Sequence, residues 1–149
     1  MKVERAYTKA SESPYEAIPF RLASSEIRNP DGTVVFRLDE VEVPSAWSQV
    51  AVDVLAQKYF RKAGVPARLK VVREKGVPSW LCRRTADTKA LEALPEDARL
   101  VGETSAQQVF DRLAGTWTYW GFKHGYFDGE ADARAFYDEH RYMLARQIA

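Results

Sequence analysis

The stretch Thr104–Trp120, TSAQQVFDRLAGTWTYW, decides the fold, because it carries the clearest helix pattern in the chain. Its apolar residues recur at steps of three and four, the spacing that buries one face of an α-helix. The string Thr104-Ser105-Ala106-Gln107 fits a capping box, in which the threonine hydroxyl and the glutamine side chain satisfy free backbone N–H groups. We predict a helix over 104–120 whose buried stripe is Ala106, Val109, Phe110, Leu113, Ala114 and Trp117.

A second helix is predicted just downstream, over 129–149. Gly121 and Gly125 interrupt the first helix, and Asp128 can cap the second. Neither Gly, Asn nor Pro follows the last apolar residue to close the helix. We therefore expect a helix that either frays at its end or continues into a larger protein. Its stripe is Ala133, Phe136, Tyr137, His140, Leu144 and Ile148.

Aromatic residues crowd the connection between these helices, in Trp117–Phe127, WTYWGFKHGYF. Such rings can form a platform that stacks on bases or saccharides, or they can pack a helix–helix corner. Lys123 is the only basic residue of the tract apart from His124, which argues against a nucleic-acid platform. The pattern favours a packed corner.

Upstream, residues 20–43 predict a β-hairpin. Asn29-Pro30-Asp31-Gly32 is a turn sequence, because proline presets one backbone dihedral and glycine accepts a positive one. Strand formers follow it over 33–38. Residues 1–19 are polar and contain Pro14 and Pro19, so they are predicted to form an irregular arm that lies on a partner.

Two further helices are predicted between the hairpin and residue 104. One spans about 45–63, capped by Ser45 and stopped by Gly64 and Pro66, and a shorter one spans 87–94. The first would bury a face made of Trp47, Val50, Ala51, Val54, Leu55 and Lys58, thickened by Tyr59 and Phe60. The expected fold class is therefore mainly α with a small N-terminal β-hairpin, an α+β arrangement.

Composition excludes several classes of function. The 149 residues are 46% hydrophobic and 29% charged, with a net charge of +1. These values are typical of one globular domain and give no electrostatic footprint for nucleic acid or an anionic membrane. The chain has neither a signal peptide nor an apolar run of membrane-spanning length, so a cytoplasmic protein is expected.

No self-sufficient active site emerges from the side-chain chemistry. The single cysteine, Cys82, cannot form an internal disulfide or a multi-cysteine zinc site, and a buried apolar role is favoured over a reactive thiolate. His140 lies on an apolar stripe, and His124 has no acid or thiol partner in sequence. The adjacent carboxylates Asp138 and Glu139 are expected on an exposed face. The acids at 128, 130 and 132 do not have calcium-loop spacing. We predict no catalytic, cofactor-binding or metal-binding residue.

Four strings in this chain resemble the N-terminal region of adenosylcobalamin-dependent (class II, vitamin B12-dependent) ribonucleotide reductases. They are SEIRNPDGTVVFRLDEVEVP (25–44), WSQVAVDVLAQKYFRKAGVP (47–66), SAQQVFDRLAGTWTYWGFKHGYF (105–127) and ARAFYDEHRYMLARQIA (133–149). The resemblance runs from about Tyr15 to Ala149. His124 and Cys82 depart from the family pattern, and neither suggests a gain of chemistry.

The resemblance implies a helical domain, residues 20–149, that precedes a catalytic α/β barrel. The parent enzyme would be a ribonucleoside-diphosphate reductase of DNA-precursor synthesis that uses adenosylcobalamin and is often dimeric. The family's catalytic residues and cofactor contacts lie downstream of the matched region, so none is transferred to this chain, which is expected to be inactive alone and to bind no cofactor.

The expected partner is the catalytic barrel of the same enzyme, in cis or as a separate chain, and neither nucleic acid nor membrane. Residues expected to pack in the domain or against that partner are Trp47, Tyr59, Phe60, Trp117, Trp120, Tyr126, Phe136, Leu144 and Ile148. Two alternatives stay open: a free-standing interaction or regulatory module, and an unrelated small protein that binds ligands at an aromatic site.

Overall fold

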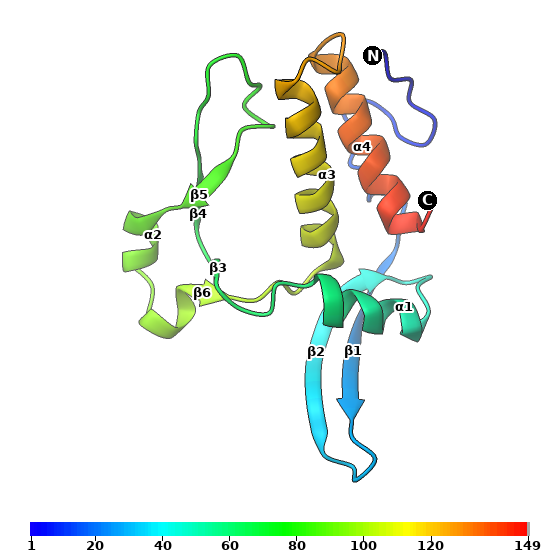
Figure 1. Ribbon diagram of the computed structural model, residues 1–149, viewed down its shortest axis with the longest axis vertical. Helices are drawn as coiled ribbons and strands as arrows, with labels where there is room; N and C mark the ends of the chain where they lie inside the picture. The colour runs from blue at the N-terminus through cyan, green and yellow to red at the C-terminus, as the bar shows by residue number, and fades with distance from the viewer. Residues whose placement is uncertain (149) are drawn as a thin grey trace.

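A computed structural model describes residues 1–148. Its long elements are a hairpin near the N-terminus and two helices near the C-terminus, with shorter elements between them (Figure 1). In chain order these are β1 (Phe20–Arg28), β2 (Val34–Pro44), α1 (Gln49–Val54), the π-helix η1 (Leu55–Tyr59), β3 (Val65–Pro66), β4 (Leu69–Val71), β5 (Arg84–Ala86), α2 (Thr88–Glu92), the 3₁₀-helix η2 (Glu96–Ala98), β6 (Leu100–Val101), α3 (Ala106–Lys123) and α4 (Glu130–Arg146).

The prediction of a mainly α fold is wrong. Helices account for 36% of the chain and strands for 21%, so the fold is α+β without a helical majority. Three antiparallel two-stranded sheets form among the described residues, β1–β2, β3–β6 and β4–β5. Residues 67–73 suggest either a short strand or a helical turn, and β4 lies within them. The pairing in the last two sheets was not predicted, because strands of two or three residues are too short to show an alternating pattern in sequence.

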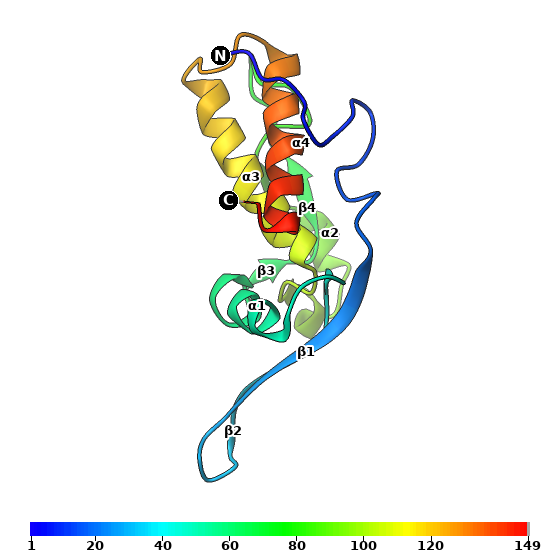
Figure 2. The same cartoon turned by 90° about the vertical axis from the view of Figure 1, so that its right-hand side faces the viewer.

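The core lies where α3, α4 and the base of the hairpin meet. Figures 1 and 2 show α3 and α4 side by side, with the N-terminal arm running along α4 and α1 crossing near the start of α3. Phe110 of α3 is fully buried between Trp47 and Tyr15, at ring-centroid distances of 5.7 and 6.4 Å. The buried apolar residues are Tyr15, Ile18, Ala23, Val41, Val43, Val52, Leu55, Ala56, Phe60, Ala106, Val109, Phe110 and Ala145.

The hairpin has a buried base and a projecting tip. Near the base, Ala23 pairs with Val41 and both are buried. A bulge follows between Ala23 and Ser25, where Glu40 adopts a left-handed backbone conformation with φ of 55°. Because a bulge bends the strand that carries it, it separates the buried base from the tip, which extends away from the body in Figure 2.

The buried face predicted for the 45–63 helix is correct at Leu55 and Phe60 and wrong at Val50 and Val54. Val50 and Val54 are exposed, whereas Val52, Leu55, Ala56 and Phe60 are buried. The helix begins only at Gln49, after Ser48 as its N-cap, and becomes a π-helix at Leu55. Apolar residues occur all round this segment, so a 3.6-residue pattern cannot identify the buried face. The wider π-turn also changes which residues lie on that face.

The caps of α3 and α4 also differ from the predicted ones. The capping box of α3 lies one residue later, with Ser105 as the N-cap and Gln108 as its partner. Gln108 Oε1 accepts hydrogen bonds from the amides of Thr104 and Ser105, at 2.7 and 3.0 Å. Gly129 is the N-cap of α4 and provides no side-chain cap.

The helix predicted over 129–149 has a definite end, which sequence did not reveal. α4 stops at Arg146, and Gln147 adopts the left-handed conformation with φ of 55°. The amide of Ile148 then donates to the Met143 carbonyl at 2.9 Å, as in the helix-closing motif that normally uses glycine. Ala149 lies outside the described residues.

Candidate interaction surface

Three large aromatic side chains are exposed together on α3 and the turn that follows it. Trp117, Trp120 and Tyr126 retain 44%, 56% and 63% of their surface. The two tryptophans are three positions apart and therefore project from the same side of α3. We call these three residues, with the half-buried Phe136 and His140 of α4 beside them, the aromatic surface.

Stacked rings hold Trp117, His140 and Phe136 of the aromatic surface in place. Trp117 stacks on His140 with 4.8 Å between ring centroids, and His140 and Phe136 form an edge-to-face pair at 5.4 Å. Phe136 in turn lies 5.3 Å from Phe127, which follows the turn. Burial lowers the pKa of His140, so the neutral imidazole is favoured beneath Trp117.

Gly121 allows the turn to close against α3. A Cβ built at Gly121 would lie 2.9 Å from the ring of Phe127, so any side chain there would displace the ring. The amide of Tyr126 donates to the Gly121 carbonyl at 2.9 Å and completes the turn. This close approach packs Phe127 and Tyr126 against α3 at Gly121.

The other residues predicted to pack or form an interface divide between core and surface. Phe60 is buried, and Trp47 and Leu144 pack against the core. The Trp47 indole N–H donates to the Ala145 carbonyl at 2.8 Å, which ties the chain before α1 to the end of α4. Tyr59 is exposed on η1, and Ile148 is half-buried beyond α4.

The N-terminal arm is fastened along α4 by acidic side chains, which sequence reasoning missed. The Met1 amino group donates to Asp128 and to the Tyr126 carbonyl, and the Val3 amide donates to Asp132 at 2.9 Å. Farther along, Tyr7 stacks on Tyr142 with 5.3 Å between centroids. The arm therefore lies on its own helix, contrary to the expectation that it lies on a partner.

Asp138 and Glu139 are buried, so the prediction of an exposed acidic pair is wrong. Asp138 retains 1% of its surface and Glu139 8%. The arm covers the carboxylate groups of both residues and donates hydrogen bonds to them. In the sequence, only their position beside the predicted apolar stripe hinted at burial, and it did not show that the N-terminal arm covers them.

A second polar contact, which is partly buried, joins α3, α4 and the chain before the hairpin. The Tyr15 hydroxyl donates to Asp111 at 2.8 Å, and Arg141 donates to the same carboxylate at 3.1 Å. The Arg141 guanidinium also lies 4.0 Å from the centre of the Tyr137 ring. Burial and the Asp111 carboxylate raise the pKa of Tyr15 above its ordinary range, so its hydroxyl remains a donor.

The described residues offer contact surfaces rather than a reaction centre. Among residues 1–148, no cluster of three or more His, Cys, Asp or Glu side chains is placed to hold a metal ion. Cys82 is buried and its Sγ lies 3.7 Å from the Val77 carbonyl. His124 is exposed at the turn, 6.1 Å from the Tyr126 ring. Helices in the described part of the chain are too short or too polar to cross a membrane.

Comparison with known proteins identifies a family. Residues 21–147 match the family model described as class II vitamin B12-dependent ribonucleotide reductase. The chain is 67% identical over 148 residues to the vitamin B12-dependent ribonucleotide reductase of Bradyrhizobium diazoefficiens, and 63% identical over 147 residues to that of Agrobacterium fabrum. The reductase of Streptomyces clavuligerus is 29% identical over 150 residues. Each match covers 99% of this chain and 12% of the relative's length.

Proposed function

The chain belongs to the class II vitamin B12-dependent ribonucleotide reductase family, as its N-terminal domain, and we propose that it braces the catalytic remainder of such an enzyme. In the relatives, the matched region and the remaining length form one polypeptide. The parent activity that we propose is reduction of ribonucleoside diphosphates for DNA synthesis. A cytoplasmic location is part of the same proposal.

The exposed aromatic surface is the observation that carries this role. Trp117 is held by stacking on His140 and still retains 44% of its surface, and Trp120, three positions further along α3, retains 56%. Tryptophan and tyrosine are enriched among the residues that contribute most to protein–protein binding, because they bury large areas with few rotatable bonds. A partner that covers this surface would meet a preformed set of rings.

We also propose a division of the chain into an arm and a domain. Residues 20–149 would form the bracing domain, and residues 1–19 an arm added to it. Support comes from the irregular backbone of the arm and from its side-chain attachment to α4. Tyr15 and Ile18 contribute to the core, so the last part of the arm would be integral to the domain, whereas residues 1–12 cover its outside.

Adenosylcobalamin is the cofactor that the family implies, and the relatives are named as vitamin B12-dependent. The described residues do not fit this cofactor. A surface cavity of about 560 Å³ is open to solvent and its walls include Arg5, Glu130 and Arg134, rather than an enclosed apolar surface for a large ring. We therefore derive no step of the reaction from this chain and propose that the remainder of the enzyme holds the cofactor.

Binding to the catalytic remainder tests the proposal directly. The remainder of the Bradyrhizobium diazoefficiens reductase, without its matched N-terminal residues, would be titrated with this chain by calorimetry. We expect the Trp117→Ala, Trp120→Ala double variant to bind at least about tenfold more weakly, because truncation of a central interface tryptophan typically costs about 2 kcal/mol or more.

Val50→Ala is the matched control, since Val50 is exposed on α1, near the start of α3 and away from the turn that carries Tyr126 (Figure 1). Circular dichroism would verify that both variants are folded. Equal binding by the double variant and the wild type would contradict the assigned surface. Reduction of nucleotides by the purified chain alone would contradict a non-catalytic role.

A further inference from the structure

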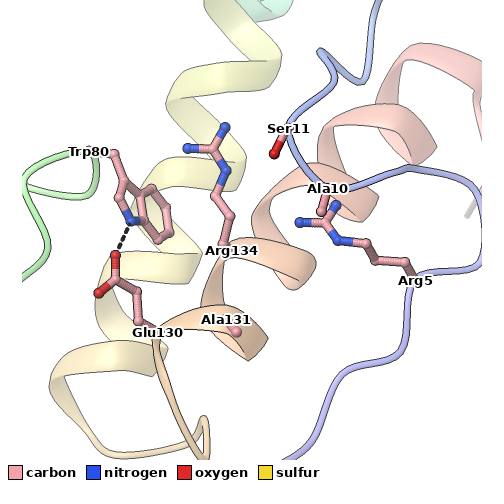
Figure 3. Close-up of a pocket in the computed structure, with 7 residues that line it drawn as sticks. All are labelled: Arg5, Ala10, Ser11, Trp80, Glu130, Ala131 and Arg134. Carbon is pink, nitrogen blue, oxygen red and sulfur yellow. Dashed lines mark hydrogen bonds between the residues drawn. The ribbon is translucent and has the colours of Figure 1, made fainter.

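A surface cavity of about 560 Å³ lies between the arm, the start of α4 and the loop that carries Trp80. It is distinct from the aromatic surface, and its walls come from segments far apart in sequence (Figure 3). The lining residues are Arg5, Ala10, Ser11, Trp80, Glu130, Ala131 and Arg134. A concave site of this kind would present several polar groups to one ligand.

Three guanidinium groups converge on one buried carboxylate beneath this cavity. Asp138 accepts hydrogen bonds from Arg5 at 2.9 Å, Arg134 at 3.2 Å and Arg141 at 2.7 Å. Arg141 has a second carboxylate partner, Asp111, at 3.1 Å. Arg5 and Arg134 share Asp138 as their one carboxylate partner within the described residues. Glu130 in the cavity wall adds a third carboxylate, so the three guanidinium charges are balanced locally and the cavity's capacity for a ligand rests on guanidinium N–H groups without a partner.

Arg134 has hydrogen-bonding capacity to spare. Only its Nε is engaged, with Asp138, and neither Nη atom donates to a described residue. Figure 3 shows its guanidinium raised between Trp80 and the arm, with the Ser11 hydroxyl directed into the same space. Ser11 is held there by a left-handed backbone, with φ of 69°, which is uncommon for serine.

The opposite wall is a fixed indole ring. The Trp80 Nε1–H donates to Glu130 at 2.9 Å, and the Arg134 guanidinium lies 5.0 Å from the ring centre. Tyr137 supports the ring from the side at 5.7 Å. Arg5 is more engaged than Arg134, because its Nη1 donates to the Thr8 hydroxyl at 2.8 Å and its Nη2 to Asp138. The cavity therefore combines the two Nη groups of Arg134, a hydroxyl and a flat apolar wall, and its volume exceeds that of a phosphate group alone.

We propose that this cavity binds a small organic phosphate, with its phosphate group on Arg134, Arg5 and the Ser11 hydroxyl. Guanidinium forks match the geometry of phosphate oxygens and form strong charge-assisted hydrogen bonds. The organic part would lie towards Trp80. The carboxylate of Glu130 opposes the ligand's charge and limits its affinity. This inference does not depend on the proposed bracing role.

Phenyl phosphate and inorganic phosphate are suitable probes, with phenol as the uncharged control. Calorimetry at constant ionic strength would give Kd, and the indole N–H resonance of Trp80, assigned with Trp80→Phe, would report the location. We expect Arg134→Gln to weaken phenyl phosphate binding about tenfold. Glu130→Gln should strengthen binding about threefold, because it removes a nearby negative charge and keeps an oxygen acceptor for Trp80.

Arg68→Gln is the matched control, since Arg68 is exposed and donates only to the adjacent Ala67 carbonyl. Its Kd should equal that of the wild type. Unchanged binding in Arg134→Gln, phenol binding as tight as phenyl phosphate, or no binding at millimolar concentration would overturn the proposal. If Arg134→Gln does not fold, Glu130→Gln decides: unchanged or weaker binding would overturn it.

Discussion

Thr8 and Glu139, which are 131 positions apart, are joined by two hydrogen bonds to the same carboxylate oxygen. Oε1 of Glu139 accepts from the Thr8 amide at 2.8 Å and from the Thr8 hydroxyl at 2.6 Å. The Tyr7 amide approaches both carboxylate oxygens at 3.1 Å. Glu139 has no cation within salt-bridge distance among the described residues, so backbone and hydroxyl donors of the arm alone stabilise its charge.

This arrangement predicts a pH dependence of stability. Burial opposes ionisation of Glu139, but the hydrogen bonds from Thr8 and Tyr7 outweigh it and hold its pKa below the ordinary value of 4.5. The folded state therefore binds this proton less readily than the unfolded chain. The stabilisation is present above about pH 4.5 and is lost as the pH falls through the lowered pKa.

Glu139→Gln measures that contribution. The amide NH₂ would face donors of the arm, so we expect the free energy of unfolding at pH 7 to fall by about 1–3 kcal/mol. The difference between wild type and variant should shrink below pH 4.5, as followed by urea denaturation at each pH. Glu16→Gln, at an exposed carboxylate, is the control. A difference that stays constant down to pH 3 would contradict the assignment.

The indole of Trp47 predicts a second loss of stability. Its N–H satisfies the Ala145 carbonyl in the last turn of α4 at 2.8 Å, where helix carbonyls lack partners within the helix. Trp47→Phe keeps an aromatic ring beside Phe110 but removes the donor. We expect a cost of about 1–2 kcal/mol in urea denaturation.

Trp120→Phe is the comparison for Trp47→Phe, because Trp120 is exposed and its indole has no hydrogen bond to a described residue. Its change should stay within about 0.5 kcal/mol. Equal losses in the two variants would show that ring size, rather than the hydrogen bond to Ala145, determines the effect.

Sequence patterns predict the long helices well, because burial of one face repeats over several turns. Val109, Phe110 and Ala114 all lie on the predicted stripe of α3 and are buried. Trp117 lies on the same stripe but is 44% exposed, since α4 covers its inner face only and leaves the outer edge uncovered. A stripe therefore identifies the helix face, and tertiary packing decides how far it is covered.

Contacts between distant segments were beyond sequence reasoning. Glu139 is a charged residue beside an apolar stripe, and only the arm's return along α4 makes it buried. The cavity beside Arg134 likewise depends on Ser11 and Trp80, which no spacing rule connects. Short strands such as β3 and β6 depend on pairing with each other rather than on local pattern.

The end of α4 yields a prediction of increased stability. Gln147 occupies a left-handed conformation that glycine adopts without steric cost, whereas other L-residues are disfavoured there by about 1–2 kcal/mol. Gln147→Gly should therefore raise the free energy of unfolding by about 0.5–1 kcal/mol, after the extra chain entropy of glycine is subtracted. Gln147→Ala is the matched control, because it removes the side chain beyond Cβ without relieving the backbone. A melting temperature that is higher for the alanine than for the glycine variant would contradict the left-handed end of α4.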